Sequence, residues 1–364
     1  MMTEAALQSD LAIPPGEYIS EVLEEYGMSQ AELARRMGRP AQAVNEIVKG
    51  DKAITPDTAL QLEKALGLPA ALWLGLESQY QLTKARQTEG ADSMLEVGLV
   101  DEFPYREMVK LRWVTPARKP ADKVLALRGY LGVSSLGSVQ NVHAYNLAFR
   151  KKGKASPYAV AAWLRHAELE AIKTPTAPFS LGRLKALLPE IRALTALEPE
   201  VFLPKLYDLL ASCGVALVIQ PHLPKTYAHG AVFWVGDKAV LVVTIRGKWA
   251  DIFWFTLFHE IGHLVLHGKK SILEEDNSDD PEFTRLEEEA NCFSRNTLIA
   301  PGDYESFIWK NSFTYADVST FARHIGVHAG IVVGRLQYDK HLPPTHLHSL
   351  RQQYIWKTNA SKED

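Results

Sequence analysis

Residues 251–267 read DIFWFTLFHEIGHLVLH, and this stretch decides the fold of the C-terminal half. Apolar residues occupy nearly every side of its helical period, which predicts a helix buried in a core. His259 and His263 stand four residues apart, so both imidazoles project from one face and can reach one zinc ion. Glu260 is placed to hold a water molecule as a general base. The alternative is a pair of hydrogen-bonded core histidines, which the cost of burying two histidines and a carboxylate without a metal disfavours.

A tetrahedral ion needs a further ligand from outside this helix, because one straight helix cannot wrap around it. His267 lies eight residues after His259, about 12 Å further along the helix axis and too far away to share the ion. A metzincin would carry a histidine six residues after His263, and that position holds Lys269. The third ligand is therefore expected from a different element.

The preferred third ligand is Glu287, which opens the run EEEAN at residues 287–291 and begins a second amphipathic helix. Glu287 and Asn291 lie one turn apart on one face. We expect Glu287 to bind the metal and Asn291 to accept the second N–H of a ligating histidine. Glu288 and Glu289 are alternatives, and an ordinary solvated acidic face is the other interpretation. Glu287 is preferred because it alone pairs with Asn291 at this spacing.

Two runs, TLFHEIGHLVLHG at residues 256–268 and EEEANCFSRNTLIAP at residues 287–301, closely resemble the ImmA/IrrE family of zinc metallopeptidases. The resemblance covers about residues 200–340. It implies a gluzincin-like α+β domain that cleaves a protein, usually a transcriptional repressor. The site residues that it implies are a catalytic base, Glu260, and three zinc ligands, His259, His263 and Glu287.

Three apolar runs before or near the metal helix predict a small sheet: residues 215–219, 231–235 and 239–245, with Gly236-Asp237 as the turn between the last two. We expect the run 239–245 to bind the substrate backbone by edge addition. No transition-state donor stands out from the sequence. The weak candidates, each more typical of a structural role, are Tyr227, His229 and Arg246.

The N-terminal part reads as short helices separated by glycine turns. Its segment GMSQAELARRMGRPAQAVNEIVKGDKAITPDTALQLEKALGLPAALWL, residues 27–74, resembles the XRE-type helix-turn-helix and, within it, the antitoxins of the HigA group. The resemblance covers residues 13–82. It implies a DNA-binding transcription regulator of a toxin–antitoxin or phage-control system.

This resemblance implies that residues 40–48 form the helix that lies in the major groove of DNA. Gln42 and Asn45 carry amides that can pair with adenine. Arg39 and Lys49 flank them as guanine or phosphate contacts. These four side chains are the expected centre of the DNA interface.

Further DNA contacts are expected beside that helix. Ser29 and Gln30 stand at a helix N-terminus and are placed for a phosphate. Pro40 and Ala41 stand where the family often has a hydroxyl residue and a longer polar one, so base contacts are expected to be fewer than usual. Residues 1–80 carry six Lys/Arg against twelve Asp/Glu, but five of the six cations fall between positions 35 and 52. Local clustering matters more than the total, because salt screens charges beyond about 8–10 Å.

The 364 residues are enough for more than one core, and their composition is that of an ordinary globular protein. We expect a mainly α protein with a small β-sheet (α+β). The two cysteines, Cys213 and Cys292, each stand alone, which indicates neither a disulfide framework nor a cysteine zinc site and fits a reducing cytoplasm. No apolar run is long enough for a membrane span. The expected parts are an all-α helix-turn-helix domain at 13–82, a linker at 83–98, a helical middle region at 99–210, the zinc peptidase domain at 211–340, and a C-terminal tail at 341–364.

Two functional hypotheses follow from the sequence. The first is a DNA-binding repressor or antitoxin that carries a Zn²⁺-dependent endopeptidase. The second is a non-enzymatic regulator whose zinc domain is structural and binds a toxin or another protein. The expected partners are double-stranded operator DNA, a protein substrate or cognate toxin, and a second copy of the chain in a homodimer, because such modules read paired half-sites.

Overall fold

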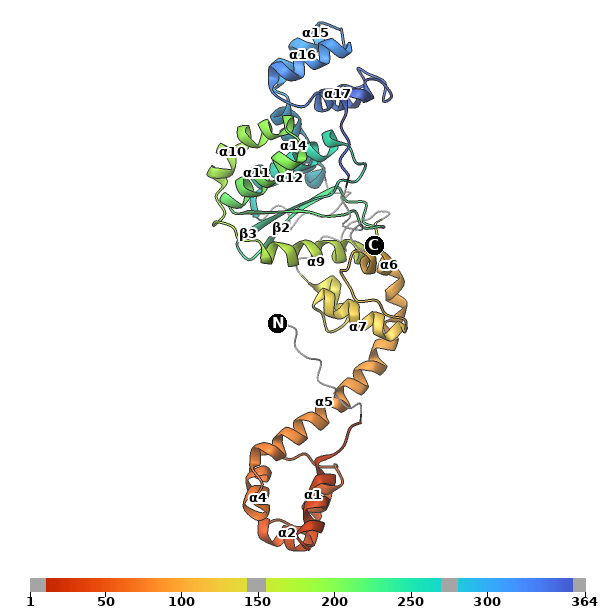
Figure 1. Ribbon diagram of the computed structural model, residues 1–364, viewed down its shortest axis with the longest axis vertical. Helices are drawn as coiled ribbons and strands as arrows, with labels where there is room; N and C mark the ends of the chain where they lie inside the picture. Colours follow the sequence, from red (N-terminus) through yellow and green to blue (C-terminus); the bar gives the residue numbers. More distant parts are fainter. Residues whose placement is uncertain (1–10, 143–154, 270–280, 356–364) are drawn as a thin grey trace, which may run out of the picture. The chain divides into compact units, whose positions relative to one another are not determined.

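The computed structural model describes residues 11–142, 155–269 and 281–355 (Figure 1). Contacts between residues divide the chain into two compact units, Met1–Leu95 and Glu96–Asp364. The boundary lies inside residues 83–98, where the sequence predicted a linker. Most of that stretch is nevertheless helical, because the last helix of the first unit continues to Leu95. None of the described helices is long and apolar enough to cross a membrane.

The described part of the first unit consists of helices, as predicted for it. The side chain of Ser29 begins one helix by accepting a hydrogen bond from the backbone nitrogen of Glu32 at 3.2 Å. Gly38 ends that helix in the left-handed region, with a φ of 64°. Inward-facing apolar side chains, among them Leu33 and Trp73, form one core. The helices are α1 (Pro15–Glu25), α2 (Gln30–Met37), α3 (Ala41–Val48), α4 (Pro56–Leu66) and α5 (Ala70–Leu95).

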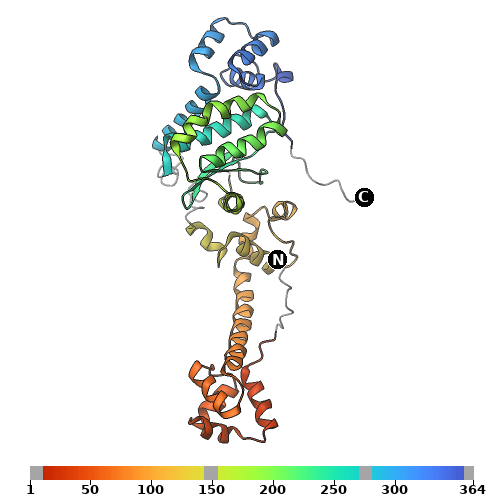
Figure 2. The ribbon, with the colours of Figure 1, turned by 60° about the vertical axis from the view of Figure 1, so that its left-hand side comes forward.

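The second unit packs helices on both faces of a small sheet (Figures 1 and 2). With the helical first unit, this confirms the predicted α+β class. Its strands are β1 (Val215–Ile219), β2 (Gly230–Val235) and β3 (Lys238–Val243). Its α-helices are α6 (Tyr105–Lys110), α7 (Pro120–Leu131), α9 (Pro157–Lys173), α10 (Leu181–Ala193), α11 (Pro199–Ser212), α12 (Ala250–Leu266), α14 (Pro281–Leu298), α15 (Pro301–Trp309), α16 (Tyr315–Ile325) and α17 (Ala329–Tyr338). Short 3-10 helices are η1 (Val97–Glu102), η2 (Leu136–Asn141), η4 (Leu194–Ala196) and η5 (His348–Leu350).

The strand order of the sheet is β1-β3-β2. β3 pairs in parallel with β1, where Val215 lies opposite Ala239, and antiparallel with β2, where Gly230 lies opposite Val243. The expectation that residues 239–245 offer a free edge is therefore wrong, because β3 is bonded on both sides. In the part of the chain that the structure describes, β2 pairs only with β3. β1 is the other edge strand, because it too pairs only with β3 among the described residues.

Successive residues of the strands alternate between two hydrophobic cores. Leu217 and Leu241 face the core that contains α12. Val218 and Val240 face the opposite core, which contains α9 and the helices before it. The region 99–210, predicted to be helical, packs on both faces of this sheet. It supplies α9 to one face of the sheet, and α10 and α11 to the other (Figure 1).

The segment after residue 340, predicted as a tail, contributes side chains to the core as far as Tyr354. Tyr354 is buried, and its hydroxyl lies 3.1 Å from the indole Nε1 of Trp254, which donates to it. Arg351 forms two hydrogen bonds with the buried carboxylate of Asp251, at 3.0 and 2.8 Å. These contacts hold the end of the described chain against α12. Residues 356–364 lie outside the described residues.

Candidate metal centre and helix-turn-helix surface

The helix α12 is almost wholly buried and lies against α14. Gly262 makes the close approach possible, because a Cβ there would lie 3.1 Å from Phe293 Cδ1 and 3.3 Å from Ala290 Cα. Ser294 on α14 adds a hydrogen bond from its hydroxyl to the carbonyl of Phe255, at 2.8 Å. Close packing at Gly262 and the hydrogen bond from Ser294 to Phe255 therefore hold together the two helices that carry the predicted ligands.

Three side chains that the sequence singled out meet between these helices. His259 Nε2 and His263 Nε2 lie 3.0 Å apart. Glu287 reaches both, with Oε2 at 3.4 Å from His259 Nε2 and Oε1 at 3.4 Å from His263 Nε2. Among the described residues, His259, His263 and Glu287 form the group of His, Cys, Asp or Glu side chains whose ligand atoms lie close enough together to hold one metal ion.

The spacing of these three ligand atoms suits zinc. Ligands about 2.0–2.1 Å from a tetrahedral zinc ion stand about 3.3 Å from one another. The observed separations of 3.0, 3.4 and 3.4 Å match that edge length. The side chains of the two histidines are only 14% and 12% exposed, whereas that of Glu287 is 38% exposed. Of the three side chains, that of Glu287 is therefore the most accessible to solvent.

The protonation of His259 follows from its neighbours. Its Nδ1 lies 3.0 Å from Asn291 Oδ1, and because an amide oxygen only accepts, Nδ1 carries a proton. Burial lowers the pKa of His259, but the carboxylates of Glu287 and Glu260 outweigh it and hold that pKa above its usual value. Burial raises the pKa of Glu287, but its hydrogen bonds to His259 and His263 hold that pKa well below the usual range.

Glu260 is buried, 7% exposed, and lies against the first residue of β2. A Cβ at Gly230 would stand 2.6 Å from Glu260 Oε1 and 2.8 Å from Thr256 Cγ2, so only a glycine leaves room for this carboxylate. The first residue of β2 therefore lies directly against Glu260, the predicted catalytic base.

The three weak candidates for transition-state donors lie around the start of β2. Arg246 donates a hydrogen bond from Nη1 to the carbonyl of Tyr227 at 2.7 Å and lies over that ring at 5.3 Å. The carbonyl of His229 accepts from the backbone nitrogen of Thr244 at 2.8 Å. Burial and the charge of Arg246 lower the pKa of His229, so its ring is neutral near pH 7. Whether any of these three side chains acts as a transition-state donor stays a prediction.

The predicted DNA-contacting residues gather around α3, which spans Ala41–Val48. Gln42 is exposed, and its amide donates to Glu46 Oε1 at 3.0 Å. Arg39 donates from Nε to Gln61 Oε1 at 2.5 Å, so this guanidinium is already held by α4. Ala41, Lys49 and Ser29, which caps α2, are also exposed. Asn45 and Gln30, the first residue of α2, are half-buried.

Two family models match the chain. The model described as helix-turn-helix covers residues 19–73, and the model described as the IrrE N-terminal-like domain covers residues 223–337. Virulence-associated protein I of Dichelobacter nodosus is 39% identical over 77 residues, which are 21% of this chain and 71% of that protein. The HTH-type transcriptional regulator YddM of Escherichia coli is 32% identical over 74 residues, 20% of this chain and 79% of its own. A solved structure, antitoxin HigA of Pseudomonas aeruginosa with the higBA promoter, is 35% identical over 22% of this chain and 90% of its own, with a TM-score of 0.22.

The chain belongs to the helix-turn-helix family and carries an IrrE-like domain. The first unit contains the whole helix-turn-helix match, and the match to the IrrE-like domain begins shortly after β1 and ends in α17. It therefore includes α12, α14 and the strands β2 and β3.

The IrrE-like domain contains two polar residues beside the metal site whose contacts were not predicted from the sequence. His267, set aside as a ligand, lies behind His263, with 3.0 Å between their Nδ1 atoms. Glu289, weighed only as an alternative ligand, lies with Oε2 at 3.1 Å from His267 Nε2. The contact between His263 and His267 could have been predicted, because residues four apart on a helix lie next to each other.

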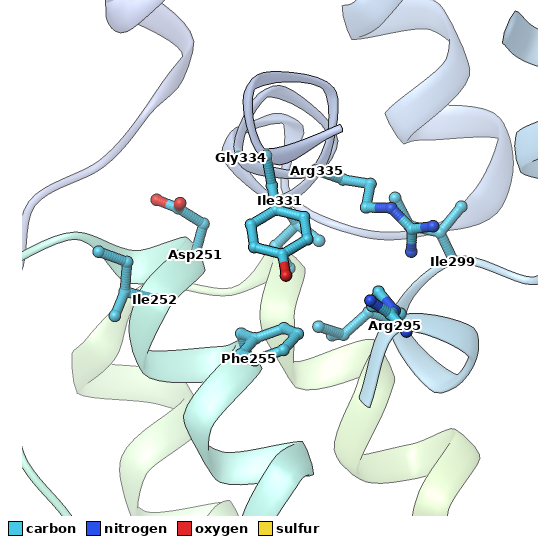
Figure 3. A pocket seen from close by; sticks show the side chains of 10 residues that line it. Asp251, Ile252, Phe255, Arg295, Ile299, Ile331, Gly334 and Arg335 are labelled. Atoms are coloured by element: carbon cyan, nitrogen blue, oxygen red, sulfur yellow. The ribbon is translucent and has the colours of Figure 1, made fainter. Parts of the chain in front are cut away.

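A cavity of about 270 Å³ lies beside the metal helices in the same domain (Figure 3). Its wall is mostly apolar and includes Phe255. Figure 3 shows the guanidinium groups of Arg295 and Arg335 on the same side of the cavity. Each of them is bound to a carboxylate, that of Glu288 or Asp339, at 2.5 Å. None of the three clustered ligands lines this cavity, so it is distinct from the metal centre.

Proposed function

We propose that this protein is a DNA-binding transcription regulator, of an antitoxin or phage-control type, whose IrrE-like domain is a zinc-dependent endopeptidase. The observation that carries the proposal is the convergence of two imidazoles and one carboxylate at zinc spacing, with Glu260 between this cluster and an open strand. His259, His263 and Glu287 are the proposed ligands. A zinc ion held there supplies Lewis acidity, which polarises a peptide carbonyl and acidifies water.

Glu260 is the proposed general base. Its carboxylate takes a proton from the attacking water and passes it to the nitrogen of the leaving amine, so that the peptide bond breaks without release of a strongly basic anion. Its position next to β2 and its near-complete burial support this role, because a buried carboxylate beside the scissile bond is shielded from competing solvent. Asn291 is proposed to keep His259 in the tautomer that leaves Nε2 free.

The open edge of β2 is the proposed docking strand for the substrate. A peptide that adds to this edge forms backbone hydrogen bonds and needs no particular sequence to do so. Because β2 begins against Glu260, a peptide lying along it passes the proposed base and the ligand cluster. This placement favours an extended or unfolded segment of a protein as the substrate.

The endopeptidase is tested with the Glu260→Gln substitution. Elemental analysis of purified protein should find one zinc per chain in the wild type and in Glu260→Gln, but none in His263→Ala. Loss of a general base lowers a rate by about 10²–10⁴-fold, so new protein N-termini should arise in cells that produce the wild type and not in cells that produce Glu260→Gln. Glu305→Gln, an exposed change on α15, is the matched control.

If cells with Glu260→Gln show the same N-termini and the same phenotype as the wild type, hydrolysis is not the function of the domain. The non-enzymatic alternative, a zinc-stabilised module that binds a toxin or another protein, would then stand. Zinc in His263→Ala at the wild-type ratio would refute the ligand assignment itself.

DNA binding is proposed for the first unit, supported by its match to the helix-turn-helix family and by the exposure of Ala41 and Gln42 at the start of α3. Operator DNA is the proposed partner and a homodimer the proposed binding species, because helix-turn-helix modules read paired half-sites. The operator is found by selecting bound fragments from genomic DNA that include the promoter of the protein's own gene.

Two variants then separate base contacts from phosphate contacts. Gln42→Ala should weaken operator binding by about 1–3 kcal/mol and relax the preference at one base pair, whereas Lys49→Ala should weaken binding to all sequences alike and lower the salt slope by about 1. Gln79→Ala, on the exposed side of α5, is the control. Equal affinity and equal salt slope for both variants and the wild type would exclude α3 as the reading helix.

A further inference from the structure

His267 has a buried ring with a polar neighbour at each nitrogen. Its side chain is 3% exposed, although it caps the C-terminal end of α12. Its Nδ1 lies 3.0 Å from His263 Nδ1, and its Nε2 lies 3.1 Å from Glu289 Oε2. Glu289 is in turn held by Arg285, whose Nη1 donates to the other carboxylate oxygen at 2.6 Å. A continuous polar chain therefore runs from the metal cluster to the surface of α14.

The groups at the two ends of this series, the metal-facing Nε2 of His263 and the carboxylate of Glu289, fix the direction of each hydrogen bond between them. For His263 Nε2 to present a lone pair to the metal cluster, the proton of this ring must be on Nδ1. That proton is donated to His267 Nδ1, which is left as the acceptor. The remaining proton of His267 is then on Nε2 and is donated to the Glu289 carboxylate, which only accepts. One arrangement of protons satisfies all three groups.

We propose that His267 and Glu289 are positioning residues that fix the ring and the tautomer of His263 and thereby raise the affinity of the cluster for zinc. The inference rests on the proposed metal site but not on proteolysis. The two histidine ligands are supported differently: His259 by the neutral amide of Asn291, and His263 by a second imidazole that ends on a charged carboxylate. Groups that support a ligating histidine in this way typically contribute 10- to 100-fold to metal affinity.

The proposal is tested on the full-length protein by measuring the dissociation constants of zinc and cobalt in competition with a chelator. His267→Leu removes the acceptor and should weaken both metals by about 10- to 100-fold. His267→Asn keeps an acceptor oxygen near the place of Nδ1 but does not reach Glu289, so its affinity should fall between those of His267→Leu and the wild type. Glu289→Gln should weaken binding less, because its carboxylate is 40% exposed.

Two comparisons distinguish positioning from general destabilisation. Glu288→Gln, which removes a neighbouring carboxylate that is 63% exposed and pairs with Arg295, should leave the affinity unchanged. The double variant His267→Asn/Glu289→Gln should bind no more weakly than His267→Asn alone, because the link to Glu289 is already broken. The thermal unfolding midpoint of the metal-free protein should stay the same in His267→Asn and Glu289→Gln.

Wild-type affinity in His267→Leu or strictly additive losses in the double variant would overturn the proposal. If His267→Leu does not fold, His267→Asn and Glu289→Gln decide the question, and wild-type affinity in both would overturn it. A wild-type protein that binds neither metal would refute the proposed metal site first. Metal binding with normal dependence on His267, but without any cleavage, would refute only the endopeptidase.

Discussion

Gly230 has a backbone that alanine can also adopt, since its φ lies outside the left-handed region. What excludes a side chain there is the neighbour: an added Cβ would lie within 3 Å of both Glu260 and Thr256. The Glu260 carboxylate can therefore take its position only because residue 230, on β2, has no Cβ. This dependence is invisible to sequence patterns, because nothing local to residues 229–231 marks a close contact with a helix thirty residues later.

Gly230→Ala is expected to push the Glu260 carboxylate out of place while leaving the zinc ligands intact. A displacement of about 1 Å can lower the rate by about 10²-fold, so cleavage of a substrate found by comparing protein N-termini should fall steeply while zinc content stays at one per chain. Gly182→Ala, on α10 where a Cβ meets open space, is the control. Cleavage at the wild-type rate in Gly230→Ala would show that the contact does not matter.

Helices α12 and α14 were predictable because their signals are local. Apolar residues all around α12 predicted burial, and the spacing of Glu287 and Asn291 predicted one shared face, which the structure brings to the two histidines. The order of the strands was not predictable in this way. An apolar run such as residues 239–243 indicates a strand, but which neighbours it pairs with depends on segments elsewhere in the chain. The same holds for His267: its distance along the helix excluded it as a ligand without revealing what it contacts.

The end of the described chain illustrates the same limit, because nothing in the polar sequence after residue 340 predicted that Arg351 pairs with a buried carboxylate. Asp251 at the start of α12 lies in a space left by Gly334, where a Cβ would stand 2.4 Å from Oδ2. Burial raises the pKa of this carboxyl, and the guanidinium of Arg351 opposes that effect. The ion pair is about 10% exposed on each side. It fixes the beginning of the metal helix from a distance of 100 residues in the sequence.

Arg351→Ala is expected to lower the free energy of unfolding of the second unit by about 3–5 kcal/mol, because it leaves a buried carboxylate without its partner. Unfolding followed by tryptophan fluorescence and circular dichroism in denaturant measures the loss. Lys173→Ala, which breaks an ion pair whose side chains are 68% and 42% exposed, should cost less than about 1 kcal/mol. Similar losses for the two variants would contradict the structural role given to Arg351.

The molecule as a whole consists of two units with cores of their own. The core of the first contains Trp73, and the second has one core on each face of its sheet. The proposed zinc ligands lie in the second unit only, and the predicted DNA-contacting residues lie in the first. Unfolding of the whole chain is therefore expected to proceed in two steps, and a metal ion should affect only one of them.

Removal of zinc with a chelator is expected to lower the unfolding temperature of the second unit and leave that of the first unchanged. A ligand at 100 times its dissociation constant stabilises the state that binds it by about 2.7 kcal/mol. Differential scanning calorimetry with and without the chelator resolves the two transitions, and His263→Ala should match the chelated wild type in both conditions. A shift of both transitions by the chelator would mean that the units do not unfold independently.

The open side of β2 also bears on how the purified protein behaves. Among the described residues β2 pairs with no strand on its outer side, and such an edge beside apolar residues such as Trp234 is a template on which identical chains can stack through intermolecular β pairing. Lys269 places a positive charge over the Trp234 ring, 5.3 Å from its centre, and thereby discourages such stacking at the hairpin end. Aggregation in concentrated samples is therefore expected to begin at this strand and to be relieved by an added peptide that occupies it.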